Sequence, residues 1–111
     1  MIAGPVDHIA VRTTDADALT VFLTDVLGLS RQGSDARRLF PLPGGVTLAV
    51  FGAGTPGGGL GSVETEKLPD HIALRVEDVE AVRAVLAARG YIMDGDMVVA
   101  PGGLCLQFVG P

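Results

Sequence analysis

The sequence predicts an α+β fold made of two βαβββ modules, whose mixed sheets curve around a shared cavity. The first observation behind this prediction is an internal repeat, in which DHIAVR at residues 7–12 returns as DHIALR at residues 70–75. When residues 7–23 are paired with residues 70–86, 8 of 17 positions are identical. The second observation is that the same order of strand-like and helix-like segments follows each copy.

The ends of the two modules repeat as well. GGVTLAVFG at residues 44–52 is echoed by GGLCLQFVG at residues 102–110. One domain of 111 residues therefore divides into module one (1–52), a connector (53–68) and module two (69–111). The connector is rich in glycine, so we expect a flexible link there, with a loop that covers a ligand as the alternative.

Module one opens with an extended apolar segment over residues 6–12, and apolar residues at helical spacing follow it. Asp15 is the predicted N-cap of this helix, and Gly28 is its predicted end. Two further strands are predicted over residues 38–42 and 46–51, after a loop that contains glycine.

Module two repeats this plan. A strand is predicted over residues 71–76, and a helix lies between the N-cap Asp78 and the stop signal Gly90. The Asp94-Gly95 pair predicts a hairpin turn. Three strands complete the module, over residues 91–93, 97–100 and 104–109.

Alternation along the strands sorts their side chains between two faces. The smaller and more polar face carries both histidines of the chain, His8 and His71. Small residues beside histidines favour a hollow over a packed core on this face. The other face collects large apolar residues, which we expect to pack beneath the helices: Ile9, Val11, Leu48, Val50, Ile72, Leu74, Leu104, Leu106 and Phe108.

Composition bounds the class of protein. Apolar residues make up 48% of the chain and charged residues 19%, which is typical of a globular domain rather than a disordered one. The net charge of −5 argues against a nucleic-acid partner. The single cysteine, Cys105, gives no sign of an oxidising compartment. Apolar runs are too short for a membrane span and the start lacks a signal-peptide core, so we expect a cytoplasmic protein with no membrane partner.

The duplicated DHIA opening, the VLGL sequence at residues 26–29 and the βαβββ order resemble the vicinal oxygen chelate superfamily, also called the glyoxalase / bleomycin resistance / extradiol dioxygenase group. The resemblance covers nearly the whole chain. Within the superfamily, residues 69–90 look most like methylmalonyl-CoA epimerase and its small relatives. The resemblance implies the fold specifically, and it leaves the activity open because the fold hosts many chemistries.

In metal-dependent members, each module supplies one ligand from its first strand and one from its last. The matching positions here are His8, His71 and Gln107, while the fourth is Ala49, which cannot bind a metal ion. Such a set suits a divalent zinc, cobalt or nickel ion, and the alternative is that the histidines only form hydrogen bonds in the cavity. Further cavity residues expected on the same face are Thr47, Phe51 and Cys105, of which Thr47 and Cys105 are the nearby substitutes for the missing ligand.

The resemblance implies a metal-assisted isomerase or lyase that acts on a small oxygenated or carboxylated metabolite, such as a thioester. The acids that would move a proton are not at their usual places, because Gln107 replaces one of them and the other cannot be located. Glu64, Glu66, Asp94 and Asp96 are expected in turns and loops. The alternatives are a metal-free protein that binds a small molecule or antibiotic, and a regulatory module without chemistry. We expect a small-molecule ligand and a homodimer, since relatives commonly dimerise.

Overall fold

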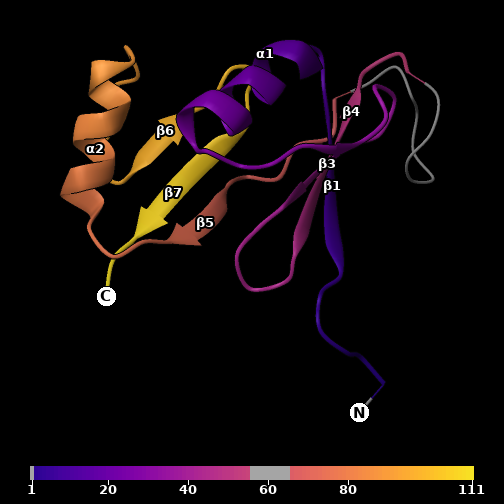
Figure 1. The fold of residues 1–111 in the computed structure, drawn as a ribbon, viewed down its shortest axis with the longest axis horizontal. Coiled ribbons are helices and arrows are strands. Elements are labelled where there is room, and N and C mark those ends of the chain that lie inside the picture. The colour runs from indigo at the N-terminus through magenta and orange to yellow at the C-terminus, as the bar shows by residue number, and fades with distance from the viewer. Residues whose placement is uncertain (1, 56–65) are drawn as a thin grey trace.

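The computed structural model describes residues 2–55 and 66–111 (Figure 1). Most of the predicted connector, together with Glu64, lies outside these residues. The fold class is as predicted: an α+β molecule in which each half contributes its own mixed sheet.

Module one forms a four-stranded sheet with the strand order β1-β4-β3-β2. β1 and β4 run parallel, and the β4–β3 and β3–β2 pairs are antiparallel. The elements of this half are β1 (His8–Thr13), α1 (Ala16–Val21), the π-helix η1 (Phe22–Val26), β2 (Gln32–Gly33), β3 (Arg38–Pro41) and β4 (Thr47–Gly52).

Module two forms a three-stranded sheet with the strand order β5-β7-β6, in which β5 and β7 run parallel and β6 is antiparallel to β7. Its elements are β5 (Ile72–Arg75), α2 (Val79–Ala88), β6 (Met97–Val99) and β7 (Cys105–Val109).

The strand predicted over residues 91–93 does not form. The predicted turn is present, because Asp94 and Met97 exchange backbone hydrogen bonds of 2.8 and 3.0 Å. The ladder ends there, however. Tyr91 packs its ring edge-on against Phe22 and Met93 is buried, so side-chain packing directs this segment away from the sheet.

Both predicted helix starts are confirmed. The Asp15 carboxylate accepts a hydrogen bond from the amide of Ala18, and Asp78 does the same for Ala81. The predicted first helix is divided, however, because its second half is the π-helix η1. There Leu27 N–H donates to Phe22 O, a bond across five residues. Gly28 follows with φ +74°, which only glycine adopts without strain.

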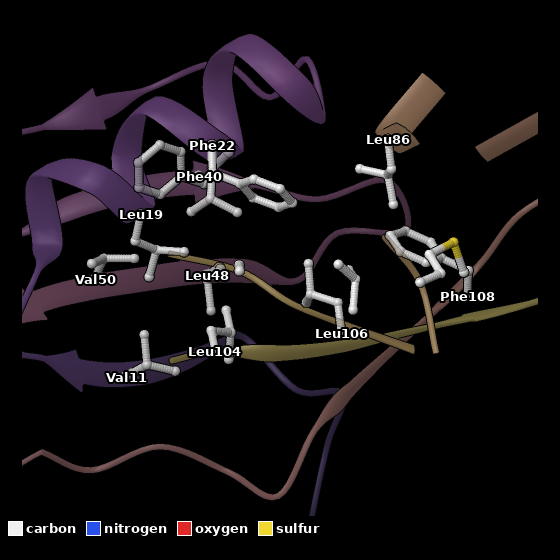
Figure 2. Close-up of a cluster of buried hydrophobic side chains, with 14 residues drawn as sticks. Val11, Leu19, Phe22, Phe40, Leu48, Val50, Leu86, Leu104, Leu106 and Phe108 are labelled. Carbon is white, nitrogen blue, oxygen red and sulfur yellow. The ribbon is translucent and has the colours of Figure 1, made fainter. Parts of the chain in front are cut away.

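One core joins the two modules. Figure 2 shows Leu19 and Leu48 of module one gathered with Leu104 and Leu106 of module two. Leu48 of β4 and Leu106 of β7 belong to the apolar faces, so the helix-facing sides of both sheets turn toward this core, as the alternation predicted. On the opposite face, His8 begins β1 and is exposed, whereas Ala49 and Phe51 of β4 are buried; His71, also exposed, precedes β5.

Candidate functional site

An open hollow of about 870 Å³ lies on the apolar side of the sheets, between the two modules. Ile9, Leu29 and Leu42 line it from module one. From module two, β5 and α2 contribute, and Val85 of α2 is 54% exposed toward solvent. Among the described residues that line it, only Arg75 has a charged or polar side chain. A hollow of this size and character is typical of sites for small apolar ligands.

The strand β5 and the residue after it, Val76, form one wall of the hollow with five consecutive residues, 72–76. Side chains of a strand alternate between its faces, so one face cannot account for all five. β5 is an edge strand, and only β7 pairs with it among the described residues. β5 therefore borders the hollow with more than its apolar face.

Each histidine is held by the aspartate that precedes it. His8 Nδ1 lies 2.9 Å from Asp7 Oδ2, and His71 Nδ1 lies 2.7 Å from Asp70 Oδ1. The repeat thus reproduces the same carboxylate–imidazole pair twice. Such a pair places the ring proton on Nδ1 and leaves Nε2 as the free nitrogen, which is the arrangement that carboxylates give to metal-binding histidines.

Gln107 has a partner that the sequence did not indicate. Its amide nitrogen donates a 2.9 Å hydrogen bond to Asp96 Oδ2, from the turn before β6. An ionised carboxylate only accepts hydrogen bonds, so the amide nitrogen must face Asp96 and the amide oxygen must face away. Sequence reasoning had placed Asp96 in a solvated turn, and its spacing from Gln107 gave no signal of this contact.

The other predicted cavity residues are scattered. Ala49 and Phe51 are buried, and the guanidinium of Arg12 lies 5.3 Å from the centre of the Phe51 ring. Thr47 lies opposite His8 in the β1–β4 register. Cys105 is half-buried in β7 opposite Val99, and it borders a second, smaller hollow. None of the predicted site residues lines the large hollow.

No group of three or more histidine, cysteine, aspartate or glutamate side chains within residues 2–55 and 66–111 is arranged to hold a metal ion. His8 belongs to the first sheet and His71 precedes the first strand of the second sheet. Whether the two rings reach one ion stays a prediction.

Comparison with known proteins supports the fold first. The structure is similar to a possible glyoxalase from Bacillus cereus, with a TM-score of 0.74 at 18% identity, covering 96% of this chain and 99% of that one. It is similar to TnmS3, an antibiotic binding protein from Streptomyces sp. CB03234, with a TM-score of 0.71 at 22% identity over 100% and 98% of the chains.

A third similar structure is lactoylglutathione lyase from Agrobacterium tumefaciens, with a TM-score of 0.69 at 15% identity, covering 97% of this chain and 94% of that one. These likenesses define the class of fold. The family follows from the sequence profile of the Glyoxalase/Bleomycin resistance protein/Dioxygenase superfamily, which matches residues 6–102. The chain belongs to this superfamily.

No curated protein matches the sequence. In the described part of the chain, no helix has the length and apolar character needed to cross a membrane.

Proposed function

We propose that this member of the superfamily binds a small, largely apolar molecule in the hollow between its modules, without a metal ion. The observation that carries the proposal is the hollow itself, about 870 Å³ in volume and lined by aliphatic side chains and Phe108. Val85 and Ile9 remain 54% and 38% exposed at its surface. A bound ligand would remove this apolar surface from water, which favours binding by about 25 cal/mol for each Å².

The structural neighbours give independent support of a general kind. TnmS3 is described as an antibiotic binding protein, so the same fold serves metabolite binding elsewhere. At 22% identity this likeness shows the fold alone, and the ligand of the present chain follows from its own residues.

A neutral apolar dye, N-phenyl-1-naphthylamine, tests the proposal because its fluorescence rises in apolar surroundings. The native protein should enhance the fluorescence in a saturable way. Val85→Arg, which places a charge in the hollow, should weaken binding at least tenfold. Val21→Arg is the matched control, since Val21 is 55% exposed on α1 and does not line the hollow. Equal binding by both variants would refute the proposal.

A second candidate function is the metal-assisted isomerase or lyase, which the two Asp–His pairs favour. Bound metal would supply Lewis-acid stabilisation of an enolate-like charge. His8, His71 and Gln107 present Nε2, Nε2 and an amide oxygen, which are acceptable donors for zinc, cobalt or nickel. We propose that a homodimer completes this site, with the histidine face of one copy against that of another.

The homodimer itself has some support in β1. Its residues His8, Ile9 and Ala10 are exposed, and the outer edge of this half of the strand has no partner among the described residues. Metal analysis of purified protein, run beside size-exclusion chromatography with light scattering, tests both points. His8→Ala and His71→Ala should each remove bound metal if the candidate is right. A monomer, or unchanged metal content in both variants, would exclude it.

A further inference from the structure

The two modules repeat in their strand pairing as well as in sequence. Ile9 pairs with Leu48 between β1 and β4. Ile72 pairs with Leu106 between β5 and β7, at the positions that the sequence repeat makes equivalent. A residue of one module can therefore be compared with its counterpart in the other, and the comparison identifies what occupies the space beside each helix.

An aromatic pair fills this space in module one. Phe22, at the start of η1, is 1% exposed. The ring of Tyr91, from module two, meets the Phe22 ring at 80°, with 5.0 Å between the ring centroids. Edge-to-face rings of this kind stabilise a contact beyond the burial of their surfaces. One ring from each module therefore closes this half of the molecule.

The counterparts of this pair line the hollow and carry no ring. Val85 of α2 corresponds to Phe22 in the repeat. Leu29 corresponds to Tyr91, because each residue directly follows the glycine after a helix. Both counterparts line the hollow, where Val85 is 54% exposed and Leu29 is half-buried. The hollow is therefore the place that the ring pair fills in the other half of the molecule.

Phe108 of β7 brings an aromatic ring to the hollow from a different element. It is 2% exposed and lines the hollow, whereas the equivalent residue of β4 is the smaller Val50. Figure 2 shows Phe22 and Phe108 well apart within the core. Each half of the molecule thus has one buried ring of its own. Tyr91 provides the second ring for Phe22, and the described lining residues provide none for Phe108.

We infer that the ligand of the hollow carries an aromatic ring, which lies between Leu29 and Val85 and packs against Phe108. The inference rests on the proposed function and deepens it, because it names the chemical class of ligand and the residues that select it. Leu29 and Val85 leave room for a ring, since both are smaller than their counterparts in the repeat. A ring placed there covers the exposed apolar surface of Val85.

The first test compares two ligands that differ only in the saturation of the ring, 3-phenylpropan-1-ol and 3-cyclohexylpropan-1-ol. Each alcohol competes with N-phenyl-1-naphthylamine for the native protein and for Phe108→Leu. The measured quantity is the ratio of the two affinities, aromatic over saturated, in which general effects of the substitution on the hollow cancel. The ratio should fall about threefold in Phe108→Leu, because leucine cannot form the contact between rings.

The second test supplies the missing ring from the chain itself. Leu29→Tyr should weaken the binding of both alcohols about tenfold or more, because the new ring takes the place of the ligand beside Val85 and Phe108. Leu29→Met is the matched control, since it keeps an aliphatic side chain of similar volume. This variant should bind both alcohols like the native protein.

Nuclear magnetic resonance locates the ligand ring in the native protein. The methyl resonances of Leu29 and Val85 should shift more with 3-phenylpropan-1-ol than with 3-cyclohexylpropan-1-ol, because an aromatic ring changes the magnetic field at nearby nuclei. Equal shifts with the two alcohols would overturn the inference.

The remaining outcomes separate the inference from the proposed function. An unchanged affinity ratio in Phe108→Leu would overturn the inference, and the proposed function would stand if Val85→Arg weakens the binding of both alcohols. Native-like binding by Leu29→Tyr would also overturn the inference, since the new ring and the ligand would then occupy different places. Absence of binding by both alcohols and by the dye would overturn the inference and the proposed function together.

Discussion

The hydroxyl of Thr13 donates a 2.6 Å hydrogen bond to the carbonyl oxygen of Gly102, and this contact joins the end of β1 to the turn before β7. Thr13 is completely buried. Gly102 adopts φ +86°, and a Cβ atom there would lie 2.7 Å from Thr13 Oγ1 and 3.0 Å from Asp15 O. Glycine is therefore needed both for its backbone conformation and for the close approach of the two modules.

Gly102→Ala should lower the free energy of unfolding by about 2–4 kcal/mol, because it adds a clash to the strain of a positive φ. Gly44→Ala is the matched control. Gly44 occupies the equivalent turn of module one with φ +95°, and nothing lies within 4 Å of an added Cβ. Strain alone should cost about 1 kcal/mol there. Urea unfolding measures the free energy of unfolding of both variants. An equal decrease in the two would show that the contact between Gly102 and Thr13 is not tight.

Arg38 ties β3 to α1. Its side chain is 12% exposed and pairs with Asp17 Oδ1 at 2.7 Å, while a second nitrogen donates to Thr20 Oγ1 at 2.9 Å. Asp17 is 90% exposed, so the larger part of the effect comes from the buried contact with Thr20. Arg38→Met should destabilise the protein by about 1–3 kcal/mol, because it removes a hydrogen bond from a charged group to a buried hydroxyl. Arg31→Met should cost less than about 1 kcal/mol, since the Arg31 side chain is itself 34% exposed and its partner Asp35 is 91% exposed. Thermal unfolding of both variants tests whether Arg38→Met lowers the stability more than Arg31→Met. A larger effect of Arg31→Met would contradict the prediction.

Gln107→Glu would restore the residue type that the family resemblance implies at this position. In this chain the new carboxylate would meet Asp96, whose Oδ2 lies 2.9 Å from the amide nitrogen of Gln107. Like charges at this distance raise the pKa of the pair in the folded state, so the variant should lose stability as the pH rises above the ordinary glutamate value of about 4.3.

Relative to the native protein, Gln107→Glu should lose almost no free energy of unfolding at pH 3 and about 1–3 kcal/mol at pH 7. Thermal unfolding across that pH range measures the difference. The double variant Asp96→Asn with Gln107→Glu should recover most of it. Loss that is independent of pH would show that the new side chain fails for steric reasons.

Glu66 contacts Thr14, the residue that follows β1. Its Oε1 atom accepts hydrogen bonds from the Thr14 hydroxyl at 2.7 Å and from the Thr14 amide at 3.1 Å. These bonds hold the pKa of Glu66 below its ordinary value of 4.5. A carboxyl with a lowered pKa stabilises the fold above its ordinary value, and the contribution is lost as the pH falls through the folded value.

Glu66→Gln should therefore lower the melting temperature at pH 7, and the gap to the native protein should close as the pH falls below 4.5. Glu77→Gln makes the same change in net charge at an exposed position and serves as the control. A difference in melting temperature that stays constant with pH would show that ionisation of the Glu66 carboxylate does not contribute to it.

The two histidines show how much of the candidate site the sequence could indicate. The repeat identified His8 and His71 as equivalent positions, and in the structure each ring contacts the aspartate that precedes it in the chain. The equivalence follows from the repeat, whereas the aspartate contacts were not predicted. Whether the two rings act on a common ligand stays a prediction, because it depends on contacts between faces that local order does not set.

The hollow could not be predicted from the same pattern. Alternation assigned Leu74 and Phe108 to the apolar face, and the expected result was a filled core beneath the helices. Leu86 is the only α2 residue that becomes fully buried, and Val85 stays half exposed. The distance between α2 and β5 depends on packing across the whole molecule. It cannot be predicted from the spacing of apolar residues in the sequence.

By itself, the sequence determined the duplicated plan, the helix starts at Asp15 and Asp78, and the division of each strand into an apolar and a polar face. These features follow from chain neighbours, whose geometry is fixed within a few residues. Only the tertiary structure decided that the apolar faces share one core, that Asp96 holds Gln107 and that β5 borders a hollow. Those contacts join segments far apart in the chain, and their geometry is set by the packing of complete modules against each other.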